Sequence, residues 1–227
     1  MTIGHTCASG VPWMETRSGT PVNIFDPDPG TIRLADIAWG LARLPRFNGQ
    51  TCLPWNVAAH SLLAEHLAPP GTPDDARLAI LLHDAHEYVT GDIITPVKQA
   101  LAAYFDLDIV SDLSRNIQRA IHIAAGIIAS PDLSRDAIKT ADMTALALER
   151  RELVQASGRD WGIPLPDVSR LRLERRWCSS KYARRDFTAR CRTLIQRCGT
   201  IPAETFIAGL YRPQSRQPDQ GASEETA

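Results

Sequence analysis

Apolar residues recur at three- and four-residue spacing along most of the chain, which predicts a largely helical protein. The first such run stops at Pro45 and predicts a helix over residues 31–44. A second amphipathic helix is expected over residues 55–68, and a third from a capping segment at residue 72 to about residue 88. The middle of this third helix, Leu78–Leu82, is apolar on nearly every side, so we expect it to be buried.

The second half of the chain continues this helical pattern. Helices are predicted over residues 107–129, 134–157 and 181–198, and the glycine and prolines within 158–180 predict a long loop. No series of strands long enough to build a sheet is visible. The expected fold class is therefore all-α, a helical bundle.

The two ends differ in composition from the centre. Residues 1–30 are rich in glycine, proline, serine and threonine and predict an irregular N-terminal arm, with short strands allowed around Val22–Phe25. Residues 213–227 are polar and lack aromatic side chains, so we expect a disordered tail. A single domain is expected over residues 31–212, since 44% hydrophobic residues support one sizeable core.

Charge and cysteine usage narrow the functional classes. A formal net charge of -1 gives no general reason to bind nucleic acid or acidic lipid. The basic segment 170–197 is open to two interpretations, a solvated helix surface, which we favour, or a face for nucleic acid or a partner. The five cysteines include no CxxC pair, which favours reduced thiols. No apolar run reaches the roughly 18 residues that a membrane span needs. We therefore expect a cytoplasmic protein without a membrane segment.

The stretch from His83 to Asp92 carries the strongest chemical signal. Imidazoles and carboxylates stand there at the end of an otherwise apolar helix, and such groups are costly to bury unless they are paired or bind a metal. On that helix His83 and Glu87 are four residues apart and share a face, and Asp84 lies about 100° around the axis. Further ligands must come from elsewhere, and His60 and Asp142 stand in apolar surroundings of two other predicted helices. This mixture of ligands suits Mn, Co, Zn, Ni or Fe.

The order of these residues resembles the H…HD…D signature of the HD superfamily of helical metal-dependent phosphohydrolases. The likeness extends to bacterial HD-domain 5'-deoxynucleotidases and to related phage and bacterial dATP triphosphohydrolases, over about residues 31–157. The segments that carry it are residues 45–47, 57–61 and 83–98. The resemblance implies a divalent metal held by His60, His83, Asp84 and Asp142, with a deoxynucleotide as substrate; whether a second ion, Mg, also binds stays open.

The resemblance also implies roles for neighbouring side chains. Glu87 would orient or deprotonate the attacking water, and Asp92 would lie near the leaving oxygen or the sugar. The expected substrate contacts are Arg46, Phe47, Thr95 and Lys98, of which the arginine can take two phosphate oxygens at once. The chain departs from the deoxynucleotidase pattern at Phe47, where the pattern has tryptophan, and at Ala59, where it has glutamate.

Several alternatives remain open at this level. Glu87 can pair with Arg46 alone, Phe47 can belong to the core, and His86 can add a ligand. Residues 90–92 can be a plain helix C-terminal turn. A phosphodiesterase acting on another nucleotide and a noncatalytic nucleotide-sensing module are the competing functions. Homodimerisation is expected from the resemblance, not from any residue pattern.

Overall fold

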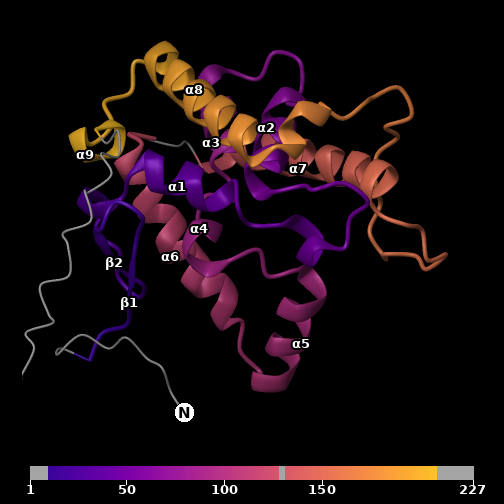
Figure 1. Cartoon of the computed structure of the whole chain (residues 1–227), viewed down its shortest axis with the longest axis horizontal. Coiled ribbons are helices and arrows are strands. Elements are labelled where there is room, and N and C mark those ends of the chain that lie inside the picture. The colour runs from indigo at the N-terminus through magenta and orange to yellow at the C-terminus, as the bar shows by residue number, and fades with distance from the viewer. Residues whose placement is uncertain (1–9, 128–130, 209–227) are drawn as a thin grey trace, which may run out of the picture.

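The computed structural model describes residues 10–127 and 131–208, and most of them are helical (Figure 1). The prediction of a mainly helical protein is confirmed. The α-helices are α1 (Leu34–Leu41), α2 (Val57–His66), α3 (Asp74–Leu81), α4 (Glu87–Thr90), α5 (Thr95–Phe105), α6 (Ile109–Ala124), α7 (Pro131–Leu153), α8 (Ser180–Cys198) and α9 (Glu204–Ile207). Short 3-10 helices are η1 (Pro29–Thr31), η2 (Arg46–Gly49) and η3 (Arg175–Cys178).

The only sheet within the described residues is a two-stranded hairpin in the N-terminal arm. Strand β1 (Trp13–Glu15) pairs antiparallel with β2 (Pro21–Asn23), which realises the short strand expected near Val22. The turn between the strands is fixed to α1, because the backbone N–H and hydroxyl of Ser18 donate to the Asp36 carboxylate at 3.0 and 2.6 Å. The described part of the arm is thus joined to the helices. Residues 1–9 and the expected tail over 213–227 lie outside the described residues, as does the expected domain end at residue 212.

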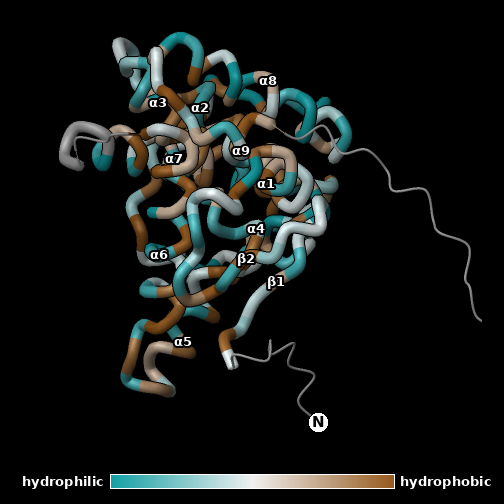
Figure 2. The backbone as a smooth tube through the Cα atoms, turned by 90° about the vertical axis from the view of Figure 1, so that its left-hand side faces the viewer, coloured by the Kyte–Doolittle hydropathy of each residue, from teal (hydrophilic) through white to brown (hydrophobic). Residues whose placement is uncertain are grey.

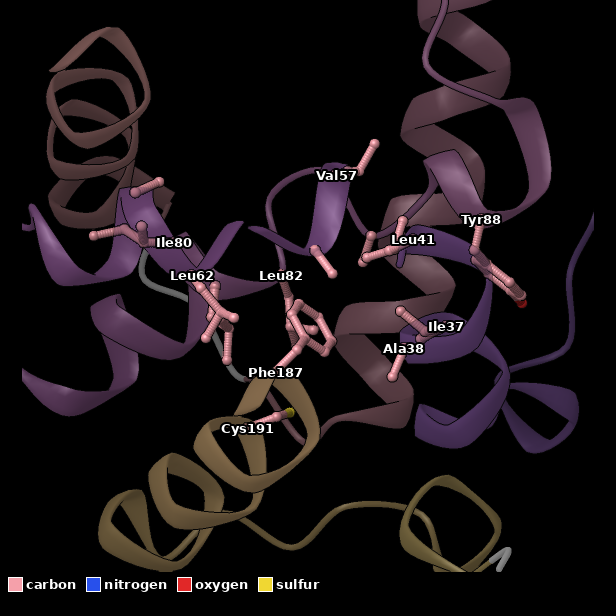
Figure 3. Close-up of a cluster of buried hydrophobic side chains, with 14 of the residues drawn as sticks. Ile37, Ala38, Leu41, Val57, Leu62, Ile80, Leu82, Tyr88, Phe187 and Cys191 are labelled. Carbon is pink, nitrogen blue, oxygen red and sulfur yellow. The ribbon is translucent and has the colours of Figure 1, made fainter. Parts of the chain in front are cut away.

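The core lies where α2, α3, α7 and α8 pack against one another. The expectation for Leu78–Leu82 is confirmed, since each of these side chains is at most 2% exposed. Figure 3 shows Phe187 of α8 pointing toward Leu62 and Leu82, with Cys191 one turn further along the helix. Burying one such aromatic side chain contributes about 2–3 kcal/mol. The packing fixes α2 and α7 relative to each other, and both helices carry predicted ligands.

The third predicted helix is wrong at its C-terminal end. It was expected to run to about residue 88, but α3 ends at Leu81 and a tight turn occupies 82–86. In this turn the backbone N–H groups bond three residues back, as from His83 to Ile80 and from Glu87 to Asp84. This is 3-10-like geometry, and α4 begins only after it. The argument that His83, Asp84 and Glu87 lie on one continuous helix is therefore wrong.

Other boundaries differ less. The helix predicted over 107–129 is α6 and ends before Gly126, whose φ of +73° breaks the helix. The helix predicted over 134–157 is α7, the loop over 158–180 is confirmed apart from η3, and the last predicted helix is α8.

Helix α5 was not predicted from the pattern. It extends from the lower end of the helical body in both views (Figure 1 and Figure 2), and none of its residues is buried. No helix in the described part of the chain is long and apolar enough to cross a membrane.

Candidate metal centre

All four predicted metal ligands converge, although they come from three separate elements. His60 is on α2, His83 and Asp84 are in the turn after α3, and Asp142 is on α7. Nε2 of His60 lies 3.1 Å from Asp142 Oδ1 and 3.5 Å from Asp84 Oδ2. Nε2 of His83 lies 3.2 Å from Asp84 Oδ2 and 3.7 Å from Asp142 Oδ1. Ligand atoms of His60, His83 and Asp84 all lie within 4.8 Å of one another, so this cluster could hold a metal ion.

The two histidines are oriented in the way a metal site requires. Nδ1 of His83 lies 2.7 Å from the carbonyl oxygen of Ile80, and since a carbonyl only accepts, Nδ1 carries the proton and Nε2 of the neutral ring keeps its lone pair. Nδ1 of His60 lies 2.8 Å from Glu149 Oε1 and is fixed in the same way. Both Nε2 atoms are buried and have no hydrogen-bond partner of good geometry among the described residues. The donor set therefore fits a divalent cation.

Protons occupy the histidines when no cation is present. Burial and Arg46 oppose protonation of His60, but Glu149 and Asp142 raise its pKa to about 9. Burial likewise opposes protonation of His83, while Asp84 and Asp142 raise its pKa well above the ordinary value. Burial alone would raise the pKa of Asp84, but His83 holds it well below its usual range. The carboxylates thus stabilise positive charge at this place, which either two protons or one divalent cation can supply.

Glu149 is a member of this cluster that sequence reasoning missed. It follows Asp142 by seven residues on α7, which is two helical turns, so both side chains project from the same face. Its side chain is completely buried and accepts hydrogen bonds from Trp55 Nε1 at 2.7 Å and from the His60 ring at 2.8 Å. In the sequence, only the seven-residue spacing from Asp142 indicates that Glu149 belongs to the site. This spacing does not distinguish a buried glutamate from one on the helix surface.

Arg46 lies directly beside the cluster. Its guanidinium nitrogens are 3.7 Å from Asp84 Oδ2, 3.9 Å from Asp92 Oδ2 and 3.2 Å from Glu149 Oε2. These are its ion pairs in the described structure, and Glu87 is not among them. An ion pair with Arg46 therefore does not account for the position of the Glu87 carboxyl group. The side chain is only 12% exposed, and the surrounding carboxylates outweigh burial and raise its pKa, so it stays charged.

Glu87 and Asp92 are carboxyl groups with unsatisfied oxygens at the edge of the cluster. Glu87 Oε2 and Asp92 Oδ2 are buried without a hydrogen-bond partner among the described residues. Burial, and after it the charges of Asp84 and Asp92, raise the pKa of Glu87 to about 9, while burial raises the pKa of Asp92. Gly91, with a φ of +77°, ends α4 and allows the chain to turn toward Asp92. The backbone of residues 90–92 is therefore a helix C-terminal turn, one of the interpretations left open above. In addition, the carboxyl group of Asp92 forms an ion pair with Arg46.

The remaining candidates divide into near and distant ones. Phe47 is half-buried, lies under the Arg46 guanidinium at 5.5 Å from its ring centroid, and is not part of the hydrophobic core. Thr95 is exposed at the start of α5, and Lys98 is half-buried on the same helix; the described hydrogen bonds and ion pairs join neither side chain to the cluster. His86 Nδ1 lies 3.3 Å from the side-chain oxygen of Gln118, away from the ligand group.

The fold and the site define a mainly helical protein with a histidine–aspartate cluster that could hold a metal ion. No model of a known protein family matches the chain. The chain is 40% identical over 195 residues to the uncharacterized protein RCAP_rcc00048 of Rhodobacter capsulatus, covering 81% of this chain and 96% of that protein. It is 31% identical over 160 residues to the uncharacterized protein YfdR of Escherichia coli, covering 69% and 83%. The chain therefore belongs to the family of these two proteins.

Proposed function

We propose that this protein is a metal-dependent phosphohydrolase of the HD type that acts on deoxynucleotides. The observation that carries the proposal is that the buried Nε2 atoms of His60 and His83 face the carboxylates of Asp142 and Asp84 at 3.1 and 3.2 Å without a hydrogen bond of good geometry among the described residues. Two imidazoles and two carboxylates that meet beside a hydrophobic core are costly to desolvate unless they are paired or bind a metal, so their convergence favours a ligand over a packing role. The order of these residues in the chain is that of the HD signature.

His60, His83, Asp84 and Asp142 would hold the cation, with Glu149 and the Ile80 carbonyl orienting the two rings. The imidazole and carboxylate donors suit Mn, Co, Zn, Ni or Fe. A cation bound there would polarise a phosphoryl oxygen and lower the pKa of a bound water.

Arg46 is the group that we assign to phosphate binding. Its planar guanidinium has five N–H donors, which its ion pairs at 3.2–3.9 Å do not exhaust. A phosphate that reaches Asp84 through a cation would therefore meet a charged, already oriented donor. The neighbouring carboxylates fix this side chain in position, so little entropy is lost on binding.

Glu87 is the group that we assign to proton transfer. In the cation-free protein its raised pKa keeps a proton on the carboxyl group at neutral pH. A divalent cation close to Asp84 would oppose the negative charges that hold this proton and so lower the pKa of Glu87. The carboxylate could then accept a proton from water, and Asp92 would lie on the Arg46 side of the same space.

The test is hydrolysis by metal-stripped protein supplied with Mn, Co, Zn, Ni, Fe or Mg and each deoxynucleoside mono-, di- or triphosphate. We expect metal-restored turnover that disappears in Asp84→Ala and persists in the matched control Asp136→Ala, an exposed residue of α7. Release of phosphate would identify a nucleotidase, and release of triphosphate a triphosphohydrolase. Metal binding without turnover of any nucleotide would remove the substrate assignment and favour the phosphodiesterase or sensing alternatives.

A further inference from the structure

A pair of aromatic rings lies next to Arg46, and one of them comes from a distant loop. The ring centroids of Phe47 in η2 and Trp161 are 6.3 Å apart, with the planes inclined by 47°. Trp161 belongs to the long loop between α7 and η3, drawn in orange where it leaves the helical body in Figure 1. The two residues are far apart in sequence, so the fold itself creates this pair.

The backbone at Phe47 is strained. Phe47 and Asn48 have φ values of 53° and 51°, and Gly49 follows with 76°, so three successive residues adopt left-handed geometry. An aromatic residue rarely takes this conformation, since its Cβ meets the neighbouring backbone, and such strain is concentrated at binding sites. Burial in the core does not explain it, because Phe47 is outside the hydrophobic core. The strained turn directs the ring to the side of Arg46 instead.

Trp161 is held in place by α7. The guanidinium of Arg150 lies 4.4 Å from the Trp161 ring centroid and also donates a hydrogen bond to the carbonyl of Arg159 at 3.4 Å. Arg150 directly follows Glu149, the residue that orients His60. The same turn of α7 therefore fixes both the candidate metal centre and the aromatic loop. Trp161 nevertheless remains 36% exposed, which leaves part of its ring open to a ligand.

We propose that Phe47 and Trp161 form a binding surface for the base of a nucleotide whose phosphate lies at Arg46. This inference rests on the proposed function. It assigns a role to Trp161, an indole that a distant segment of the chain supplies beside Phe47. Every base has a π-face, so stacking on these rings recognises a base without selecting a particular one. Along this surface the Arg46 guanidinium would bind the phosphate, and the neighbouring aromatic rings would stack on the base.

The kinetic test compares a nucleotide with a substrate that has no base. We expect Trp161→Ala to raise KM for the best deoxynucleotide by about tenfold or more, the usual effect of losing one stacked ring. The KM for 2-deoxyribose 5-phosphate, which has no aromatic ring to stack on Trp161, should rise far less than the KM for the nucleotide, and Trp161→Phe should restore most of the nucleotide affinity. The matched control is Phe25→Ala, since Phe25 is 64% exposed and follows β2, in another part of the chain. Equal effects on both substrates, or none on either, would overturn the inference.

A binding test separates this inference from the proposed hydrolase. Protein in EDTA is titrated with a deoxynucleoside 5'-monophosphate while tryptophan fluorescence is followed. We expect quenching in the intact chain and its loss in Trp161→Phe, because stacking changes the emission of the ring in contact. Quenching that depends on Trp161, without turnover of any nucleotide, would support the base site while removing the hydrolase. Absence of quenching in the intact chain would overturn the base site even if hydrolysis were found.

Discussion

Glu149 offers the sharpest test of how the candidate metal centre is built. Its completely buried carboxylate accepts from Trp55 Nε1 at 2.7 Å, from the His60 ring at 2.8 Å and from Arg46 at 3.2 Å. In Glu149→Ala the Arg46 charge loses its closest partner and two further buried donors lose their acceptor. Breaking a buried ion pair costs about 3–5 kcal/mol, so we expect a loss of that size. This is a large part of the roughly 5–15 kcal/mol that stabilises a typical domain.

The conservative change Glu149→Gln should cost less stability and still weaken metal binding. Its amide keeps one acceptor for His60 but presents N–H groups toward Arg46, so we expect a loss of about 2 kcal/mol. Metal affinity should fall about 10- to 100-fold, as when other groups that orient a ligating histidine are lost. Urea unfolding in EDTA and titration with Mn measure the two effects. Glu152→Gln, three residues further on α7, is the matched control and should cost less than about 1 kcal/mol. Unchanged stability and unchanged metal affinity in Glu149→Gln would refute this account of the site.

Three further predictions concern charge and backbone. Because the pKa of His60 is raised to about 9, its stabilising proton is fully present below about pH 6.5 in the metal-free protein and is lost as pH rises through 9; urea unfolding should show stability falling over this window, and saturating metal should flatten the fall. The raised pKa of Glu87 means that the folded chain holds a proton that the unfolded chain releases above about pH 4.5, so Glu87→Gln should stabilise the metal-free protein by about 2 kcal/mol at pH 7 while abolishing turnover; lower stability of the variant would contradict the assigned burial. Gly126→Ala should cost more than about 2 kcal/mol by thermal unfolding, since its Cβ would lie 2.7 Å from the Ile201 carbonyl oxygen, whereas Gly158→Ala, with a similar φ and open space, should cost about 1 kcal/mol; equal losses would refute the clash.

Most of the longer helices, and the four residues predicted as ligands, could be inferred from the sequence because their signals are local or shared with a known motif. The periodic runs around Leu41 and Leu62 predicted α1 and α2, and the run around Phe187 predicted α8, each within a few residues. The motif then indicated that His60 and Asp142 meet His83 and Asp84, which periodicity alone cannot do.

The turn that carries the metal motif could not be predicted from periodicity. Residues 82–86 contain no glycine or proline, so nothing in the sequence indicates that the helix ends before them. The turn differs from an α-helix in its hydrogen bonds, because the backbone N–H groups donate to the carbonyl three residues earlier. The roles of Glu149 and Trp161 depend on contacts between distant segments. The sequence around Glu149 is typical of a charged helix face, and the sequence around Trp161 is typical of a loop. Which glutamate is buried and which tryptophan contacts Phe47 is decided by side-chain packing, which the local sequence does not show.

The central claim is that His60, His83, Asp84 and Asp142 hold one divalent cation. Its most direct test is calorimetric titration of metal-stripped protein with Mn or Co, alongside Asp84→Asn and the exposed control Asp136→Asn. The account predicts one cation bound per chain in the intact protein and in the control, and affinity reduced by about 10-fold or more in Asp84→Asn, which loses one ligand charge. Equal binding by all three proteins, or no binding by the intact chain, would contradict it.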